Sequence, residues 1–412
     1  MMKRKIAIIG GGASGIMAAI SASLTNKNIT VTILERMDRI GKKILATGNG
    51  RCNFTNRNTS MYNFYGEEPD FVKNALEEFT VGDTVDFFGK IGILVKEEKD
   101  GKMYPYSNQA SSVIDALRNK LYLLENVEIV TGFDVCDIKK VKSGFEIYST
   151  DKKMCAADRV IIAGGGCAAP NLGSNGSCFK LLKKLGHGIT KLSPALVQIK
   201  TTTEIVKGLA GIKFDGTAEC YIDGEFTAKE EGEILFTDYG LSGPPIFQLS
   251  AIIGREWGKD IKIILDIMPE YEQREIYEIL RQRREILSEL SCENFFVGMI
   301  NKKIGNVIAK KSGIEKLSLM IKNIDESIMR RMAKNIKNLE FRVIETNGWK
   351  NAQVTAGGVD TGEFERESME SKKVKGLYCC GEIFDIYGDC GGYNLQWAWS
   401  SGYVAGKNAA RI

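Results

Sequence analysis

Residues 5–15 read KIAIIGGGASG, a short apolar run that leads into a cluster of glycines. The next residues, IMAAISASL at 16–24, are helix formers, so the stretch is predicted to run strand, turn, helix. It contains Gly10-x-Gly12-x-x-Gly15, with Ala13 and Ser14 between the last two glycines. In such a turn the first glycine permits the sharp bend, the second lets the backbone approach a pyrophosphate, and the third lets helix pack on strand. The stretch therefore predicts a Rossmann-like α/β domain whose helix N-terminus holds a dinucleotide.

A second predicted strand, NITVTILE at 28–35, ends in Glu35 and is followed by Arg36. An acid about 20 residues beyond the glycines binds the two hydroxyls of an adenosine ribose and disfavours a ribose phosphate, which leaves NAD or FAD. Residues 39–56, RIGKKILATGNGRCNFTN, have no hydrophobic period and are dense in hydrogen-bonding groups. A nicotinamide dehydrogenase would continue its strand–helix alternation here, so this loop favours FAD.

Composition sets the bounds of the prediction. The chain has 412 residues, 43% of them hydrophobic and 26% charged, which is typical of a globular protein of two or three domains. A net charge of +4 gives no case for nucleic acid or anionic lipid as a partner. No apolar run reaches the roughly 18 residues of a membrane span, and the signal-peptide-like start is better explained by the glycine turn. We therefore expect a cytoplasmic protein without a membrane segment.

The cysteines and the histidine exclude some site classes. Ten cysteines include no C-x-x-C pair, and with a single histidine, His187, no metal site is expected. Cys52 has no cysteine two to five residues away, so a disulfide reductase is disfavoured. A second glycine turn, in RVIIAGGG at 159–166, lacks the third glycine of a separate NAD(P)H domain. It is predicted either to close on the cofactor through Ala163, Gly164 and Gly165 or to be a structural strand end.

The C-terminal stretch GEIFDIYGDCGGYNLQ, residues 381–396, carries four glycines and leads into a last helix, WAWSSGYVAG. Gly381 and Glu382 follow a predicted strand, and Asp385 is placed to reach a ribityl hydroxyl or a phosphate-bound water. The segment from Gly392 to Gln396 is predicted to aim its N–H groups at the pyrimidine edge of a flavin. Negative charge builds at that edge on reduction, and a helix N-terminus stabilises it.

These motifs, together with FTDYGLSGPP at 236–245, resemble a family of bacterial FAD-dependent oxidoreductases. The family includes aminoacetone-oxidase-like enzymes and flavoproteins of bile-acid dehydroxylation gene clusters. The resemblance covers residues 5–407 and implies a fold of the two-dinucleotide-binding type, with tightly held FAD, an inserted β-barrel-like domain and a small helical domain. It also implies that the backbone of Val135 meets the adenine and that Thr355–Val359 lies close to the flavin, with a structural bulge as the alternative for that segment. The full set of predicted cofactor contacts is Gly10, Gly12, Ala13, Ser14, Gly15, Glu35, Arg36, Lys43, Thr47, Gly48, Asn49, Cys52, Asn53, Val135, Ala163, Gly164, Gly165, Gly381, Glu382, Asp385, Gly392, Tyr393, Asn394, Leu395 and Gln396.

Four segments are expected along the chain. Residues 1–193 begin the FAD-binding domain and residues 342–412 complete it. Residues 194–268 form an inserted β domain with Asp-Gly turns at 215–216 and 223–224, and residues 269–341 are helical. Segment 301–340 carries ten Lys or Arg against four Asp or Glu. This excess could attract RNA, but a solvated helix face is the commoner cause, so nucleic acid is not favoured as a partner.

The sequence indicates the class of reaction but not the catalytic residues, because a flavin carries the electrons itself. His187 stands at a predicted helix end, where capping is its expected role. Cys52 is read as a loop cysteine against the flavin, with an activated thiolate as the alternative. Tyr387 and Tyr393 are either proton donors or aromatic walls, and the catalytic residues stay unassigned.

The expected function is FAD-dependent reduction of an activated C=C bond in a hydrophobic small molecule, with NAD(P)H binding transiently. An O₂-dependent amine oxidase is one alternative, and a flavin-binding RNA-associated or redox-sensing protein is another. The sequence does not predict the oligomeric state.

Overall fold

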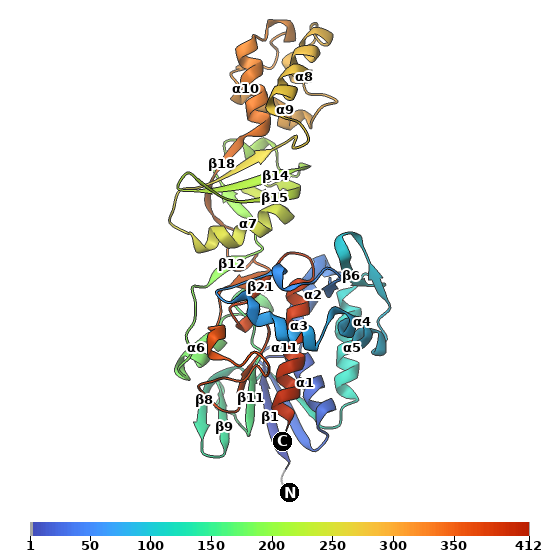
Figure 1. Ribbon diagram of the computed structural model, residues 1–412, viewed down its shortest axis with the longest axis vertical. Helices are drawn as coiled ribbons and strands as arrows, with labels where there is room; N and C mark the ends of the chain where they lie inside the picture. Colours follow the sequence, from blue (N-terminus) through green and yellow to red (C-terminus); the bar gives the residue numbers. More distant parts are fainter. Residues whose placement is uncertain (1–2, 412) are drawn as a thin grey trace. The chain divides into compact units, whose positions relative to one another are not determined.

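The computed structural model describes residues 3–411 and divides into two compact units, Met1–Pro194 with Trp349–Ile412, and Ala195–Gly348 (Figure 1). Each unit has its own hydrophobic core. All the predicted cofactor contacts lie in the first unit.

A five-stranded parallel sheet forms the centre of the first unit, in the order β20-β11-β1-β2-β7. Its strands are β1 (Arg4–Ile9), β2 (Ile29–Glu35), β7 (Val127–Thr131), β11 (Arg159–Ile162) and β20 (Leu377–Cys379). The fully buried apolar runs of β1 and β11 are typical of strands covered on both faces. Strand β20 joins this sheet from the C-terminal part of the chain, whereas residues 342–346, expected to help complete this domain, lie in a strand of the second unit.

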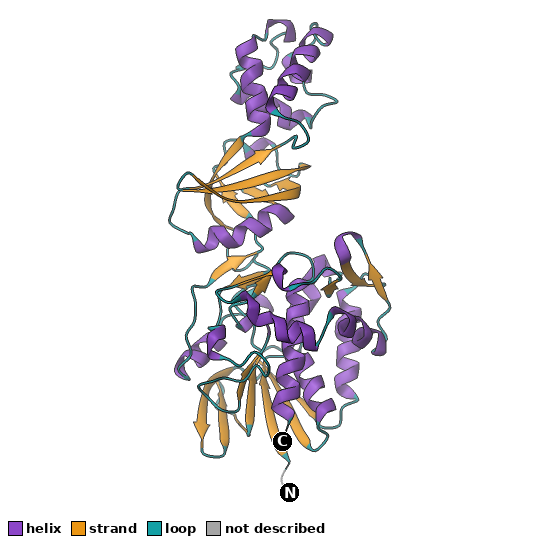
Figure 2. Cartoon of the chain, in the orientation of Figure 1, coloured by secondary structure: helices purple, strands orange, loops and turns teal. Residues whose placement is uncertain are grey.

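Helices and a small second sheet cover this central sheet (Figures 1 and 2). Helices α1 and α11 lie side by side against it. A three-stranded antiparallel sheet, β10-β9-β8, packs near β1 and β11. The remaining elements of this unit are α1 (Ala13–Thr25), α2 (Lys42–Ala46), β3 (Thr55–Asn56), β4 (Phe64–Tyr65), α3 (Lys73–Glu78), α4 (Val81–Lys90), β5 (Val95–Glu97), β6 (Lys102–Pro105), α5 (Ala110–Tyr122), β8 (Val135–Val141), β9 (Gly144–Ser149), β10 (Met154–Ala157), α6 (Ser177–Lys184), β12 (Ser193–Ala195), β19 (Val354–Ala356), β21 (Tyr387–Gly388) and α11 (Tyr393–Ala410).

The second unit is a closed antiparallel barrel with helices, in the order β13-β16-β15-β14-β17-β18. Its elements are β13 (Ile199–Thr201), β14 (Lys213–Ile222), β15 (Glu225–Phe236), β16 (Gly240–Ser242), α7 (Pro244–Arg255), β17 (Ile261–Asp266), α8 (Gln273–Ile286), α9 (Lys302–Lys311), α10 (Glu326–Lys337) and β18 (Leu339–Thr346). Barrel and helices share one core, which joins Phe341 of β18 to Met332 of α10 and Leu280 of α8. The structure thus merges the segments 194–268 and 269–341, which the sequence treats separately, into one packed unit.

Of the two predicted Asp-Gly turns, one forms and one does not. Asp223 and Gly224 both have positive φ and close the β14–β15 hairpin, as a type I′ turn requires. Asp215 and Gly216 instead lie inside β14, so this turn prediction is wrong. A side chain at Gly216 would collide with the Phe214 ring, which explains a glycine within a strand.

Candidate functional site

The predicted phosphate turn has the backbone that its glycines require. Gly10 adopts a φ of +106°, and a Cβ there would stand 2.5 Å from the carbonyl oxygen of Ala163. A Cβ at Gly15 would collide with the carbonyl of Gly10. A Cβ at Gly12, by contrast, would meet nothing within 4 Å. The turn is therefore closed by glycine on the protein side and open at Gly12, the position predicted for the approach of a phosphate.

The N-terminus of α1 fits an anion. Its N-cap residue is Gly12, which has no side chain to cap the helix, and the first turn contains no acidic residue. The first N–H groups of a helix have no partner within it, and the helix dipole places partial positive charge there. A pyrophosphate is thus the group that this helix end is suited to bind.

Glu35, at the end of β2, fits the ribose role. Its Oε2 accepts the Gly11 N–H at 2.7 Å and its Oε1 accepts the Met37 N–H at 2.7 Å. The side chain is held in one orientation, with 8% of its surface exposed. Each carboxylate oxygen still has a lone pair for a hydroxyl donor.

The next two predicted adenosine-side residues flank Glu35. The Phe133 N–H donates to the Glu35 carbonyl at 2.9 Å, which places the start of β8, at Val135, beside the end of β2. The Arg36 guanidinium lies 3.6 Å from the Asp134 carboxylate. These contacts bring Glu35, Arg36 and Val135 to one corner of the sheet.

The loop GNGRCN, residues 48–53, folds through left-handed backbone conformations. Gly48, Asn49 and Cys52 have φ values of 56°, 54° and 60°. Asn53 is buried, and its Oδ1 accepts the Met103 N–H at 3.1 Å, while the Thr47 hydroxyl donates to the Ile44 carbonyl at 2.6 Å. The loop is therefore a fixed structure, and its exposed residues are Gly48, Asn49 and Gly50.

This loop meets the N-terminus of the last helix. The Asn56 side-chain amide donates to the Gly391 carbonyl at 2.9 Å, and the Thr55 hydroxyl donates to Gln396 Oε1 at 2.5 Å. A Cβ at Gly392 would stand 2.5 Å from the Thr55 carbonyl oxygen. Helix α11, like α1, has a glycine at its N-cap and no acidic residue in its first turn. Both helix ends therefore suit an electron-rich group.

Segment 380–382 lies between the first turn of α1 and the middle of α11. The Ser14 hydroxyl donates to the Cys380 carbonyl at 3.3 Å, and the Gly381 N–H donates to the Ser401 hydroxyl at 2.9 Å. Gly381 has a φ of +78°, and a Cβ there would press on Ser14. This segment thus joins the turn at α1 to the middle of α11, although the two lie far apart in the sequence.

A polar network that the sequence does not reveal lies at this junction. Lys43 Nζ and Glu382 Oε2 form an ion pair at 2.7 Å, with both side chains about one-fifth exposed. The other carboxylate oxygen accepts the Thr355 hydroxyl at 2.9 Å, and Thr355 in turn accepts the Cys167 N–H at 2.8 Å. Lys43 and Glu382 are both predicted cofactor contacts, but nothing in the sequence signals that they pair.

The remaining predicted residues follow the glycine turn after β11 and the start of α11. Ala163 and Gly164 lie directly after β11, and Gly165 has a φ of +68°. Tyr393 and Leu395 are partly buried, and the Asn394 side chain bonds the backbone of Gly388. The Gln396 amide donates to the Phe79 carbonyl and the Ser400 hydroxyl, so its side chain is committed to the interior. Asp385 is buried and accepts the Glu67 N–H at 3.2 Å.

The structure bears on the alternative given for Cys52 and corrects the role expected of His187. Cys52 is fully buried, and burial raises the pKa of its thiol to about 12, so it is not an activated thiolate. The His187 ring does not cap a helix. Its Nδ1 lies 2.7 Å from Glu363 Oε2 and its Nε2 3.0 Å from the Ser371 hydroxyl, both in the C-terminal part of the chain.

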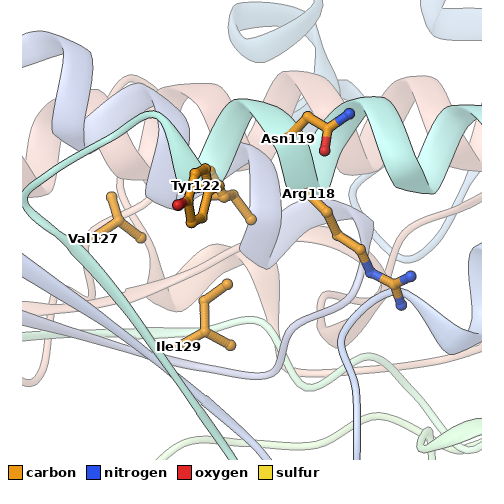
Figure 3. A pocket seen from close by; sticks show the side chains of 6 residues that line it. Arg118, Asn119, Tyr122, Val127 and Ile129 are labelled. Carbon is orange, nitrogen blue, oxygen red and sulfur yellow. The ribbon is translucent and has the colours of Figure 1, made fainter.

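Two open cavities in the described part of the chain are lined by none of the predicted cofactor contacts. One of them, of about 450 Å³, lies between the end of α5 and β7 (Figure 3). Within residues 3–411, no group of three His, Cys, Asp or Glu side chains could hold a metal ion. Over the same residues no helix has the length and apolarity to cross a bilayer.

The comparisons with known proteins identify the family of the chain. The family model described as the HI0933-like protein Rossmann domain matches residues 4–408. The chain is 40% identical to a 3-dehydro-bile acid delta(4,6)-reductase of Clostridium scindens over 98% of this chain and 99% of the other. It is 28% identical to a ribosomal RNA dihydrouridine synthase of Haemophilus influenzae, over 98% of each chain.

A solved structure of the E. coli quinol fumarate reductase FrdA has a TM-score of 0.51 and 16% identity, over 100% of this chain and 70% of that one. At this identity the likeness shows the fold alone, a Rossmann-like FAD-binding domain of the two-dinucleotide-binding type with an insertion. The match to the family model and the similarity to the reductase extend over almost the whole chain. The chain is thus an FAD-dependent oxidoreductase, and it belongs to the HI0933-like family of Rossmann-domain proteins.

Proposed function

We propose that this enzyme reduces a C=C bond conjugated to a carbonyl group in a hydrophobic organic substrate, with NAD(P)H as the electron donor. The observation that carries the proposal is the 40% identity to the 3-dehydro-bile acid delta(4,6)-reductase, which extends over nearly the full length of both chains. A similarity of that extent includes both units and every predicted cofactor contact.

Bound FAD supplies the hydride-transfer chemistry in this proposal. The residues of the chain bind and orient it. The N-terminus of α1 and the Glu35 side chain hold the dinucleotide. The N-terminus of α11 favours negative charge near Asn394. The Lys43–Glu382 ion pair fixes the segment between them.

The proposed reaction uses no cysteine thiol to pass electrons to or from the flavin. None of the ten cysteines, which all lie within residues 3–411, forms a disulfide bond, and burial raises the pKa of Cys178 and Cys380 to about 12. A thiol with so high a pKa is protonated at neutral pH and is a poor nucleophile.

Anaerobic mixing of the holoenzyme with NADH or NADPH tests the proposal. We expect the visible absorbance of the oxidised flavin to disappear and to return when an enone such as cyclohexenone or progesterone is added, with the saturated ketone as product. Bleaching by aminoacetone, with no bleaching by either nicotinamide, would overturn the proposal in favour of an amine oxidase.

A macromolecular substrate is the second candidate, because a relative at 28% identity is named for an activity on ribosomal RNA. The structure weakens the charge argument for it. Lys302, Lys322 and Arg330, in the basic segment 301–340, each pair with a nearby glutamate. Salt-dependent RNA binding that is lost on neutralising Lys303 and Lys310 would support this candidate.

A further inference from the structure

A two-stranded ribbon beside the proposed flavin end carries two stacked tyrosines. Strand β4 pairs with β21, with Tyr65 opposite Tyr387 and Phe64 opposite Gly388. The two tyrosine rings are stacked, with centroids 5.4 Å apart and planes 29° apart. Tyr387 is 6% exposed, whereas Tyr65 is 41% exposed. Tyr65 therefore rests on Tyr387 and presents part of its ring to solvent.

Hydrogen bonds fix the exposed ring in place. The Tyr65 hydroxyl donates to Asp389 Oδ1 at 2.8 Å. The Asn63 side-chain amide donates to the other carboxylate oxygen, Oδ2, at 3.0 Å. A ring held at both its face and its hydroxyl loses little conformational entropy when a ligand packs on it. Because the hydroxyl is committed to a carboxylate, Tyr65 is suited to packing rather than to proton donation.

The ribbon is joined to the start of α11. The Gly388 N–H donates to Asn394 Oδ1 at 2.7 Å, and Asn394 Nδ2 donates back to the Gly388 carbonyl at 2.8 Å. On the other strand, a Cβ at Gly66 would collide with the Asp385 carbonyl. The stacked pair is thus held between Asp385 and Asn394, the segment proposed to face the flavin.

We propose that Tyr65, supported by Tyr387 and positioned by Asp389, is the wall on which the substrate ring system lies, and that it selects flat apolar ketones of several fused rings. The inference rests on the proposed function. A fixed aromatic face attracts flat apolar rings through dispersion and area burial. A small single-ring enone would not reach far enough from the reacting bond to use this wall.

The variants Tyr65→Ala and Tyr65→Leu, which remove the flat ring, test the wall. For progesterone, which has four fused rings, we expect KM to rise about five- to tenfold with kcat unchanged, the effect of losing one aromatic contact. For cyclohexenone, kcat/KM stays at the wild-type value. Tyr65→Phe keeps the ring but loses the hydrogen bond to Asp389, so we expect KM for progesterone to rise by less than in Tyr65→Ala. The matched control is Tyr122→Ala, which removes a tyrosine that is 90% exposed at the end of α5. We expect it to leave KM and kcat unchanged for both substrates.

A binding measurement separates failure of the wall from failure of the reductase. Progesterone is titrated into the oxidised holoenzyme, and the Kd is read from the perturbation of the flavin spectrum. We expect the same five- to tenfold weakening in Tyr65→Ala, with flavin content and Tm unchanged. No spectral binding of progesterone to the wild type, or an equal Kd in wild type and Tyr65→Ala, overturns the wall. Binding that depends on Tyr65 without turnover of any enone supports the wall and instead overturns the proposed reduction.

Discussion

At the scale of single residues, Glu35 has the best-defined role toward the cofactor. Two backbone N–H groups orient its carboxylate, at 2.7 Å each. For Glu35→Ala we expect FAD affinity to fall about tenfold to a hundredfold, because charge-assisted hydrogen bonds to the ribose are lost. The ratio of flavin to protein after gel filtration measures this. Glu128→Ala, on the exposed side of the adjacent strand β7, is the control and should retain FAD. Equal retention in both variants would contradict the ribose role.

His187 gives a second prediction at this scale, which concerns pH. Burial lowers the pKa of its imidazole, although the hydrogen bond to Glu363 works in the opposite direction. Below the unfolded value of about 6.5, the unfolded chain therefore binds more protons than the native chain. Above that pH the contribution of neutral His187 to the free energy of unfolding is fully present. It is lost as the pH falls toward the folded pKa, by at most about 1.4 kcal/mol per pH unit.

Urea unfolding at pH about 7.5 and about 5.5 measures this loss. The chain has only one histidine, so its NMR imidazole signals follow the same titration without ambiguity. In His187→Gln, the difference between the free energies of unfolding at the two pH values should shrink by the amount that His187 contributes. If the difference is the same in that variant as in the wild type, carboxylates and not His187 cause the loss of stability.

At the scale of elements, glycines allow α1 and α11 to pack closely. A Cβ at Gly402 would collide with the Ser14 carbonyl, and one at Gly406 with the Ala18 carbonyl. We expect Gly402→Ala to lower the free energy of unfolding by about 1–3 kcal/mol, because the backbones must separate. Thermal denaturation measures the change.

The matched control is Gly89→Ala in α4, where a Cβ meets nothing within 4 Å. Alanine is the better helix former, so this variant should gain up to about 1 kcal/mol. A loss of stability at Gly89 equal to that at Gly402 would show that helix contact is not the cause.

Elements differ in how well the sequence predicts them. The strand–turn–helix at 5–24 is predictable because its glycines and apolar runs act locally. Helix α4 begins after Thr80, whose hydroxyl accepts the Asp83 N–H and caps the helix. That signal, a threonine three residues before an acid, is readable in the sequence. The Lys43–Glu382 ion pair joins residues 339 positions apart, and no local pattern indicates it.

At the scale of the whole molecule, each of the two units has a hydrophobic core of its own. The Asn347 N–H donates to the Gln198 carbonyl at 2.8 Å. The two segments through which the chain enters and leaves the second unit therefore lie side by side. We expect a protein with residues 199–346 replaced by a short Gly/Ser linker to fold and retain FAD, since every predicted contact lies in the first unit. Co-elution of flavin absorbance with folded protein measures this. A folded but colourless product would show that the second unit takes part in holding FAD.

The sequence could predict the general architecture but not the details that depend on distant segments. The return of the chain to the central sheet at β20 follows from β-type runs after residue 342. The shared core of barrel and helices does not, because periodicity shows which face of a helix is apolar and not what covers it. The partners of His187 are hidden for the same reason, since Glu363 and Ser371 follow it by more than 170 residues.

The packing of α11 on α1 has a consequence for how the protein is made. Ser14 contacts Cys380, and the helix that begins at Tyr393 packs along α1 to Ala410. Cys380 is synthesised 366 residues after Ser14, so the growing chain cannot complete this packing until α11 has been made. We expect tight binding of FAD only after that point, and a stop codon before Tyr393 to yield an apoprotein.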